Sequence, residues 1–203
     1  MANETSSVKN NNNNNMQAQA EDTGKQSGGS RDTAPLKKFF LDALKDMLWA
    51  EKALVTGLQK LQKVAASEEL ADAFETHELQ TNKHISRLEK VFDMLGEKAE
   101  AKKCKAMEGL LKEADEIVDA TPEYSATRDA AIIIAAQKVE HYEIAGYGGL
   151  VAIAHTLGYE RVAHLLEKTL MEEEDTDYML TEVAECHINF EAVQEDAHEK
   201  VTA

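Results

Sequence analysis

Cysteine is scarce in this sequence, and its two cysteines, Cys104 and Cys186, stand far apart in the chain. They form no CxxC pair, which excludes a zinc-finger or rubredoxin-type metal site. Nothing requires a disulfide between them, so we expect two free thiols. The N-terminus lacks the apolar core of a signal peptide, and no apolar run is long enough to span a membrane. These absences predict a cytoplasmic protein without a membrane partner.

Basic, aromatic and proline residues are also few. The chain has 22 Lys and Arg against 38 Asp and Glu, which gives a formal net charge of −16. This charge argues against binding to nucleic acid, whose backbone is itself anionic, and it favours cations as partners. Aromatic residues make up 5% of the chain, and Ala, Leu, Glu and Lys dominate it. Such a composition is typical of an all-α domain.

The two ends of the chain differ from its middle in composition. Residues 1–32 are mainly Asn, Gln, Ser, Gly and charged residues, with an unbroken run of asparagines over residues 10–15. We expect this segment to be a disordered tail, because it has too few apolar residues to pack. Residues 191–203 are polar and are expected to fray. The sequence therefore predicts one folded domain over residues 33–190.

Four long segments of this domain carry apolar residues at helical spacing. They cover residues 34–65, 67–96, 122–157 and about 159–186. Residues 97–121 contain only a short amphipathic helix, "AMEGLLKEADEIVD", and form a connection. Two tight turns and one long crossover predict the ferritin-like bundle of four helices that run up, down, down and up.

The expected helix ends follow from capping residues. Ser67 is the predicted N-cap of the second helix, and Gly96 is the predicted glycine that ends it. Thr121 is the predicted cap of the third helix, with Pro122 in its first turn. Gly158 separates the third helix from the fourth.

Polar residues interrupt the apolar seam of each helix near its middle. The stretch "TLMEEEDTDYML", residues 169–180, is an example, because its Glu173 occupies a seam position where an apolar residue is expected. The polar seam residues of the four helices are Glu51, His77, Thr81, His84, Glu140, Glu143 and Glu173.

These residues are expected at one depth in the bundle. Glu51 and Thr81 are equally far in sequence from the turn at residue 66, as are Glu143 and Glu173 from Gly158. At about 1.5 Å per residue, each lies about 22 Å from its turn. The turns are at opposite ends of the bundle, so all four helices bring their polar residues to its centre.

Several buried carboxylates at one level repel each other and need a strong positive counter-charge. No Lys or Arg occupies these seam positions, so the pattern predicts a pair of metal ions, with iron or manganese the best match to carboxylate and imidazole ligands. Asp177, one turn after Glu173, either ligates metal or supports the site. Tyr147 is either a hydrogen-bond donor to the site or a core residue. We expect Glu172, Glu174 and Asp175 to form a solvated face.

The alternative interpretation is purely structural. A single histidine in a helix seam is more often a core residue with a satisfied hydrogen bond than a ligand. A single glutamate in a seam often means that the helical register has been miscounted and that the residue faces solvent. It is the set of residues at one depth that favours metal.

The sequence also resembles a known family, the YciE/YciF group of bacterial ferritin-like stress proteins. The resemblance covers about residues 36–186 and rests on "AEKAL", "AFETHELQTNKHISRLEKVF", "KCKAMEGLLKEADEI", "RDAAIIIAAQKVEHYEIAGYG" and "LGYERVAHLLEKTLMEEEDTD". It implies a cytoplasmic, dimeric four-helix protein of poorly defined activity.

The "EHYE" segment is similar to the E-x-x-E of the third rubrerythrin helix, which implies that Glu140 and Glu143 are ligands. By the same resemblance, Glu51 and Glu173 match the glutamates of the first and fourth helices. The chain departs from the usual E-x-x-H of the second and fourth helices, because it has Thr81-x-x-His84 and Glu173-x-x-Thr176.

The expected function is a stress protein with two iron ions per chain, or manganese in their place, that reacts with peroxide or oxygen. The expected ligands are Glu51, His77, His84, Glu140, Glu143, Glu173 and Asp177, and no catalytic residue is assigned. The alternative is a non-enzymatic stress or scaffold protein in which metal is structural or absent. Iron storage is a third option, but nothing in one chain indicates cage-forming surfaces. A homodimer is expected from the resemblance and from Gly146, Gly148 and Gly149, which would let another helix approach closely.

Overall fold

The computed structural model describes residues 34–202, with side chains described for residues 34–195. The described part is all-α, as predicted, and contains no strand. Its helices are α1 (Ala34–Val64), α2 (Glu68–Leu95), α3 (Lys105–Ala120), α4 (Ala126–Thr156), α5 (Glu160–Val183), the π-helical turn η1 (Ala184–Ile188) and α6 (Asn189–Thr202). The predicted tail over residues 1–32 lies outside the described residues.

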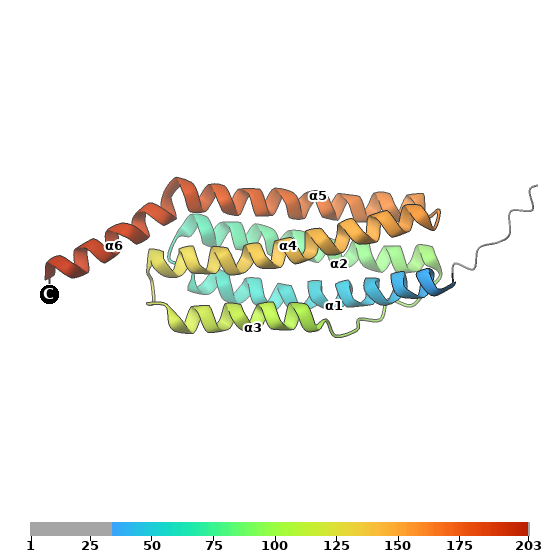
Figure 1. The fold of residues 1–203 in the computed structure, drawn as a ribbon, viewed down its shortest axis with the longest axis horizontal. Helices are drawn as coiled ribbons and strands as arrows, with labels where there is room; N and C mark the ends of the chain where they lie inside the picture. Colours follow the sequence, from blue (N-terminus) through green and yellow to red (C-terminus); the bar gives the residue numbers. More distant parts are fainter. Residues whose placement is uncertain (1–33, 203) are drawn as a thin grey trace, which may run out of the picture. The chain divides into compact units, whose positions relative to one another are not determined.

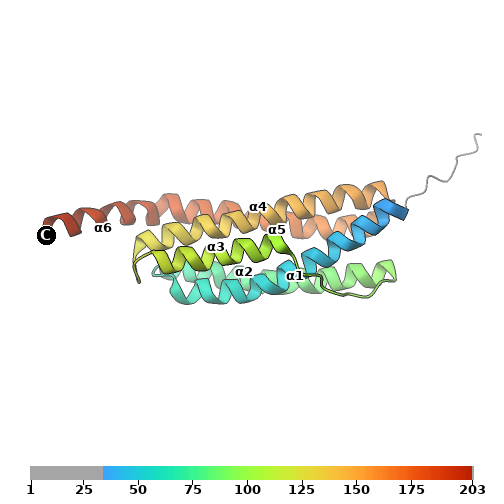
Figure 2. The ribbon, with the colours of Figure 1, turned by 60° about the horizontal axis from the view of Figure 1, so that its bottom comes forward.

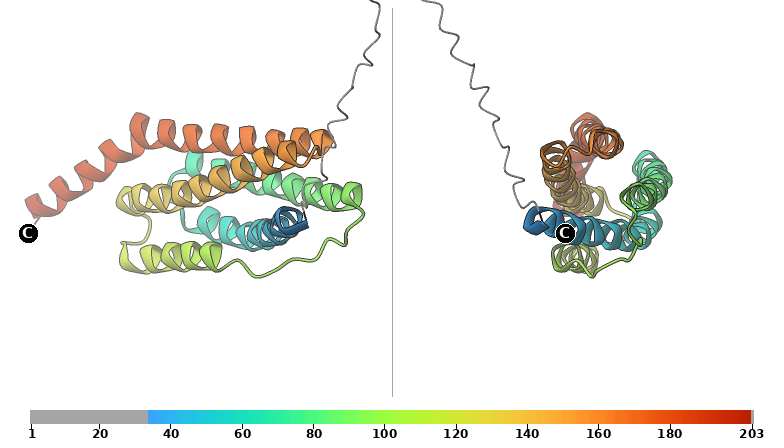
Figure 3. Two further views of the ribbon diagram at one scale, coloured as in Figure 1. Left: turned by 45° about the vertical axis from the view of Figure 1, so that its right-hand side comes forward. Right: turned by 90° about the vertical axis from the view of Figure 1, so that its right-hand side faces the viewer.

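Helices α1, α2, α4 and α5 form a bundle of two hairpins. Helix α1 packs on α2, and α4 packs on α5, while α2 contacts α5 and α1 contacts α4. Helices α1 and α5 run in one direction, and α2 and α4 run in the other (Figure 1). The short α3 lies outside this bundle against α4 and α1, as Figure 2 and the right-hand view of Figure 3 show.

Two apolar clusters fill the bundle on either side of its middle. One cluster includes Leu54, Leu58, Phe74, Ile133 and Leu180. The other includes Phe40, Leu44, Leu88, Leu150 and Leu166. The polar seam positions fall in sequence between the residues of these clusters on each helix, so the polar residues lie at the bundle centre. None of the described helices is both long and apolar enough to cross a membrane.

The predicted ends of α2 are confirmed. The Ser67 hydroxyl accepts a hydrogen bond from the Leu70 N–H at 3.4 Å, which satisfies one of the free donors at the helix start. Gly96 has φ +69° and follows the last turn, in the left-handed conformation that glycine adopts without strain. The two free thiols are also confirmed.

The predicted start of the third long helix is wrong. Thr121 caps the end of α3, and α4 begins at Ala126 with Ser125 as its N-cap, whose hydroxyl accepts from Arg128 N at 3.0 Å. Tyr124 has φ +56°, so the backbone before Ser125 cannot continue as a helix. Arg128 stabilises this turn by donating to the Thr121 carbonyl at 2.5 Å.

Asp129 connects α4 to the turn between α1 and α2. Its two carboxylate oxygens accept hydrogen bonds from Ala66 N at 2.8 Å and from Ser67 N at 2.7 Å. Only 1% of its surface is exposed. The contact fixes the first hairpin on the second, which holds the polar seams at one level.

The chain stays helical over the segment predicted to fray. After the π-helical turn, α6 runs to Thr202 and contacts α4. Glu195 accepts hydrogen bonds from Ala126 N at 2.7 Å and Thr127 N at 3.1 Å, so it caps the start of α4. This long-range contact is invisible in the local composition, which is polar throughout.

The three glycines of α4 face different surroundings. A Cβ atom at Gly146 would lie 2.9 Å from Met47 Sδ, so this glycine allows α1 to approach within the chain. Gly148 and Gly149 have no described atom in the way of a Cβ. The predicted role in helix approach is therefore seen within the chain at Gly146, and the homodimer stays a prediction.

Candidate metal centre

Each of the four bundle helices places acidic or imidazole side chains in the interior. All six of these side chains are buried, with at most 2% of their surface exposed. They are Glu51 on α1, His77 and His84 on α2, Glu140 and Glu143 on α4, and Glu173 on α5. The four helices therefore meet at one polar level, as the sequence predicts.

The six residues form two groups that share one member. His77, Glu140, Glu143 and Glu173 make up the first group, and Glu51, His84 and Glu173 make up the second. Within each group, one potential ligand atom per residue lies within 4.8 Å of all the others. We call these sets the His77 group and the His84 group. Glu173 belongs to both groups, so its carboxylate connects them.

The shortest contacts in the cluster join imidazole nitrogens to carboxylate oxygens. His84 Nδ1 lies 2.8 Å from Glu173 Oε1 and 3.6 Å from Glu51 Oε2. His77 Nε2 lies 3.2 Å from Glu140 Oε1 and 4.0 Å from Glu173 Oε2. Each histidine thus presents one ring nitrogen to the carboxylates of its group.

Most of these buried atoms lack an aligned hydrogen-bond partner among the described residues. They are Glu51 Oε2, His77 Nε2, His84 Nδ1 and both oxygens of Glu140, Glu143 and Glu173. The contacts above are short enough for ion pairs but are not aligned as hydrogen bonds. A buried polar atom without a partner is costly, so a set of them turned to one space needs a further explanation. Oxygen and imidazole nitrogen donors that converge without hydrogen bonds fit a metal site.

Without metal, the histidines are held in the protonated form. Burial alone lowers the pKa of His77, but the adjacent Glu140 carboxylate outweighs this and raises the pKa to about 9. Burial likewise lowers the pKa of His84, and contacts with Glu173 and Glu51 raise it to about 10. The two imidazolium groups partly balance the carboxylates around them.

The carboxylates are pushed in the direction of protonation. Burial raises the pKa of Glu143 well above its usual range, and the charges of Glu51, Glu173 and Glu140 raise it further. Burial raises the pKa of Glu173 to about 7, although contact with His84 opposes the shift. The metal-free cluster therefore retains protons at neutral pH that bound cations would displace.

Tyr147 donates a hydrogen bond to Glu51 Oε1 from within α4. The tyrosine is fully buried, and burial together with the Glu51 charge raises the pKa of its hydroxyl, so it remains a donor. Both roles left open by the sequence are observed, because Tyr147 packs in the second apolar cluster and also donates a hydrogen bond to the site. The bond fixes one oxygen of Glu51 and leaves the other, Oε2, facing His84.

Comparison with known proteins places the chain in a family. A family model described as "Domain of unknown function (DUF892)" matches residues 35–193, most of the described chain. The chain belongs to the DUF892 family. Protein YciF of Escherichia coli (strain K12) is 44% identical over 158 residues, which cover 77% of this chain and 95% of the relative. The resemblance predicted from the sequence is confirmed.

Solved structures of similar chains share the helical bundle. The crystal structure of the E. coli stress protein YciF matches with a TM-score of 0.73 and 43% identity, covering 76% of this chain and 97% of that one. YcfI from Rhodopseudomonas palustris, described as a structural protein, matches with a TM-score of 0.71 and 38% identity, covering 75% of this chain and 96% of that one. A Xanthomonas campestris protein at 22% identity, with a TM-score of 0.63, covers 79% of this chain and 99% of that one and shares the fold.

Asp177 is the one predicted ligand that this DUF892 chain does not bring to the cluster. Its Oδ1 lies 3.2 Å from Nδ1 of His141, which is largely exposed, and 3.3 Å from Gln137 Nε2. The side chain leaves α5 one turn after Glu173 but on the flank that faces the outer side of α4. Asp177 belongs to neither group, so the ligand set proposed below does not include it.

Thr81 and Thr176, the two positions at which the sequence departs from E-x-x-H, donate hydrogen bonds to carbonyls of their own helices. Thr81 Oγ1 donates to the His77 carbonyl at 2.9 Å, and Thr176 Oγ1 donates to the Glu172 carbonyl at 2.9 Å. Both threonines are buried. In this DUF892 chain, the second helix supplies two buried histidines to the cluster, His77 and His84.

Glu172, predicted to lie on the solvated face, is a neighbour of the cluster histidine His84. Its side chain is 33% exposed, but Oε2 lies 2.8 Å from His84 Nε2. Arg87 on α2 contacts both oxygens of Glu172. The spacing of Arg87 three residues after His84, on the same side of α2, was the signal available in the sequence.

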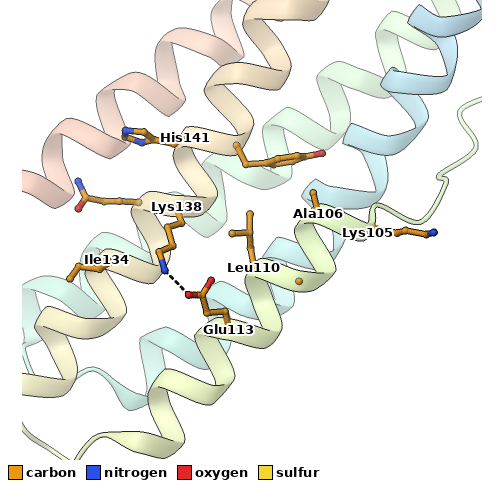
Figure 4. Close-up of a pocket in the computed structure, with 10 residues that line it drawn as sticks. Lys105, Ala106, Leu110, Glu113, Ile134, Lys138 and His141 are labelled. Atoms are coloured by element: carbon orange, nitrogen blue, oxygen red, sulfur yellow. Dashed lines mark hydrogen bonds and ion pairs between the residues drawn. The ribbon is translucent and has the colours of Figure 1, made fainter.

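A surface groove lies between α3 and α4, away from the cluster. It has a volume of about 880 Å³, and an ion pair between Lys138 and Glu113 spans it (Figure 4). Leu110, Ala106 and Ile134 give it apolar walls. No residue of either group lines it, so it gives the candidate centre no opening.

Proposed function

We propose that this DUF892 protein binds a pair of metal ions, iron or manganese, at the centre of its bundle, and that the loaded protein reacts with peroxide or oxygen under stress. The observation that carries the proposal is the set of buried oxygen and nitrogen atoms without hydrogen-bond partners, supplied by four different helices. Their division into two groups that share Glu173 supports two ions instead of one. The stress-protein description of E. coli YciF supports the cellular setting.

The proposed ligands of one ion are His77, Glu140, Glu143 and Glu173, and those of the other are Glu51, His84 and Glu173. When bound, two ferrous ions would supply the two electrons that, with two protons, reduce one hydrogen peroxide to two waters. The carboxylates would neutralise the charge of the ions, and Glu173, a member of both groups, would contribute to both positions. Tyr147 holds Glu51 in place, and the two apolar clusters exclude bulk water from both ends of the centre.

Metal analysis and a rapid-mixing experiment test the proposal together. Protein purified without chelators should contain about two iron or manganese ions per chain, as in other two-metal carboxylate bundles. The ferrous form mixed with hydrogen peroxide should be oxidised faster than free Fe(II) in the same buffer. Glu143→Gln should lose metal and this rate, and Glu174→Gln, a change at an exposed neighbour of Glu173, should keep both. Absence of metal from the wild type after growth with iron and manganese would overturn the proposal.

A non-enzymatic structural role is the second candidate, and two observations favour it. YcfI is described as a structural protein, and the cluster side chains are at most 2% exposed. In this case, metal binding would raise the melting temperature while the ferrous form would be oxidised no faster than free Fe(II). The melting temperature with and without metal shows whether metal stabilises the fold, and the oxidation rate of the ferrous form separates the two candidates. The homodimer and the cytoplasmic location remain predictions.

A further inference from the structure

The outer nitrogen of each cluster histidine has a different partner. His84 Nε2 lies 2.8 Å from Glu172 Oε2, a carboxylate. His77 Nδ1 lies 3.5 Å from Thr176 Oγ1, a hydroxyl at the limit of a hydrogen bond, and that hydroxyl already donates to a carbonyl. Both histidines are buried. Among the described residues, only the His84 ring contacts a carboxylate through the nitrogen that faces away from the cluster.

Glu172 is itself held in place. Arg87 Nη1 lies 3.0 Å from Glu172 Oε2, and Arg87 Nη2 lies 3.2 Å from Glu172 Oε1, which is a paired, two-bond contact. Arg87 also donates to Thr169 Oγ1, which is buried on α5. Since Arg87 follows His84 by one turn on α2 and Glu172 and Thr169 lie on α5, the contact fixes both helices around the ring.

This geometry determines which nitrogen of His84 is available. In a neutral imidazole, one nitrogen carries the hydrogen and the other carries the lone pair. In the neutral ring that ligation requires, a carboxylate at Nε2 selects the form in which Nε2–H is the donor, and this places the Nδ1 lone pair on the side of Glu51 and Glu173. Acceptors of this kind behind a ligating histidine orient the ring and strengthen it as a ligand.

We propose that Glu172, fixed by Arg87, is a positioning residue that holds the His84 ring with Nδ1 toward Glu51 and Glu173, and that it acts on one of the two metal positions only. The proposal rests on the proposed metal pair. Glu172 itself does not bind the ion, because its Oε2 contacts the opposite side of the ring. The two positions consequently differ, and the difference can be measured.

Cobalt(II) is the probe for the experiment. Titration of the metal-free full chain, followed by visible absorption and calorimetry, should show two binding steps in the wild type. Glu51→Gln should weaken the step that belongs to the His84 group, and Glu140→Gln should weaken the other, which assigns each step. Glu172→Ala should then lower the affinity of the His84 step about 10–100-fold, the usual effect of removing such a partner, and change the other step less than about threefold.

Three further variants complete the design. Glu172→Gln keeps an oxygen that can accept from Nε2–H and should recover part of the lost affinity. Thr176→Val removes the weaker contact of His77 and should leave both steps within about threefold of wild type, far below the effect of a lost charged partner. Glu174→Gln is the matched surface control and should change neither step.

A spectroscopic measurement separates positioning from general stability. In the cobalt-loaded protein, the Nε2–H of His84 should give a paramagnetically shifted proton signal that exchanges slowly with water. Glu172→Ala should speed this exchange or abolish the signal, and the corresponding His77 signal should remain. If the wild type binds two cobalt ions and Glu172→Ala changes neither step, or weakens both equally, the positioning role is wrong and the metal pair stands. If the wild type binds no cobalt at this centre, the metal pair itself is wrong.

Discussion

Glu173 Oε1 lies 2.8 Å from His84 Nδ1, and both side chains are fully buried at the bundle centre. In the metal-free protein, the protonated His84 ring supplies part of the positive charge that a bound metal ion would otherwise supply. Glu173 also faces His77 at 4.0 Å, so one carboxylate connects the two groups. Metal binding and protonation of the cluster are therefore alternatives, and this has consequences that can be measured.

Metal binding should release protons. The pKa values of His77 and His84 are about 9 and about 10 without metal, and that of Glu173 is about 7, so protons occupy these residues at pH 7. Ligation requires the deprotonated form, so loading should release about two or more protons per chain. Calorimetric titration with Mn²⁺ at pH 7 in buffers of different ionisation enthalpy measures this number. A heat that is independent of the buffer would contradict the prediction.

The stability of the metal-free protein should fall as the pH rises. For each of these groups the pKa in the folded state is raised, so the folded chain binds protons that the unfolded chain has lost. The contribution of Glu173 is lost as the pH rises from its usual pKa of 4.5 to about 7, and those of His77 and His84 are lost between the usual pKa of 6.5 and pKa values of about 9 and about 10. Urea unfolding of the metal-free protein between pH 5 and pH 10 should show a decreasing free energy of unfolding.

Glu143→Gln provides the matched variant for this pH dependence. The pKa of Glu143 is raised well above its usual range by burial and by three neighbouring carboxylates, so its ionisation at high pH destabilises the fold. Gln cannot ionise, so the variant should lose less stability than wild type between neutral and alkaline pH, while it binds metal more weakly. The exposed Glu174→Gln should follow the wild-type curve. Glu173→Gln is less suitable, because it also removes the contact with His84.

The bundle, and the meeting of six of the seven predicted ligands at its centre, could be predicted from the sequence because both depend on local periodicity. Glu51 and Glu173 occupy seam positions that only helical spacing defines, and equal distances from two turns place them at one level. Asp177 was ambiguous for the same reason, since it is one position off the seam and its direction depends on the twist between α4 and α5. Its contacts with His141 and Gln137 required the packed structure.

Two contacts that could not be predicted from the sequence are long-range and polar. The acidic run of Glu172, Glu174 and Asp175 predicts a solvated face, and only the packing of α2 on α5 brings Glu172 to His84. The same holds for Glu195, which caps α4 from a segment that looks unstructured in sequence. Thr121 was predicted as a cap because Thr-Pro often starts a helix, but here it ends the preceding one.

Asp129→Ala should destabilise the fold without touching the cluster. The change leaves the N–H groups of Ala66 and Ser67 without their acceptor at the turn between α1 and α2. The expected loss is about 2 kcal/mol, the usual cost of leaving such groups unpaired. Urea unfolding measures the loss, and metal content per folded chain should stay at the wild-type level. Asp129→Asn keeps one acceptor oxygen and should lose less, and an effect of Asp129→Ala on metal content alone would contradict this structural role.

Tyr147→Phe tests the hydrogen bond that the Tyr147 hydroxyl on α4 donates to Glu51 Oε1. The variant removes the hydroxyl that donates to Glu51 and leaves the ring in place, so the volume of the core changes little. Glu51 Oε1 then loses its only neutral donor in a fully buried setting, and the metal-free protein should lose about 1–3 kcal/mol of stability. With metal bound, the ions neutralise Glu51, so the loss should be smaller than in the metal-free form.

Tyr178→Phe at an exposed position of α5 is the matched control and should change neither form. Equal losses with and without metal would show that the Tyr147 hydroxyl contributes to the core but not to the organisation of Glu51 as a ligand.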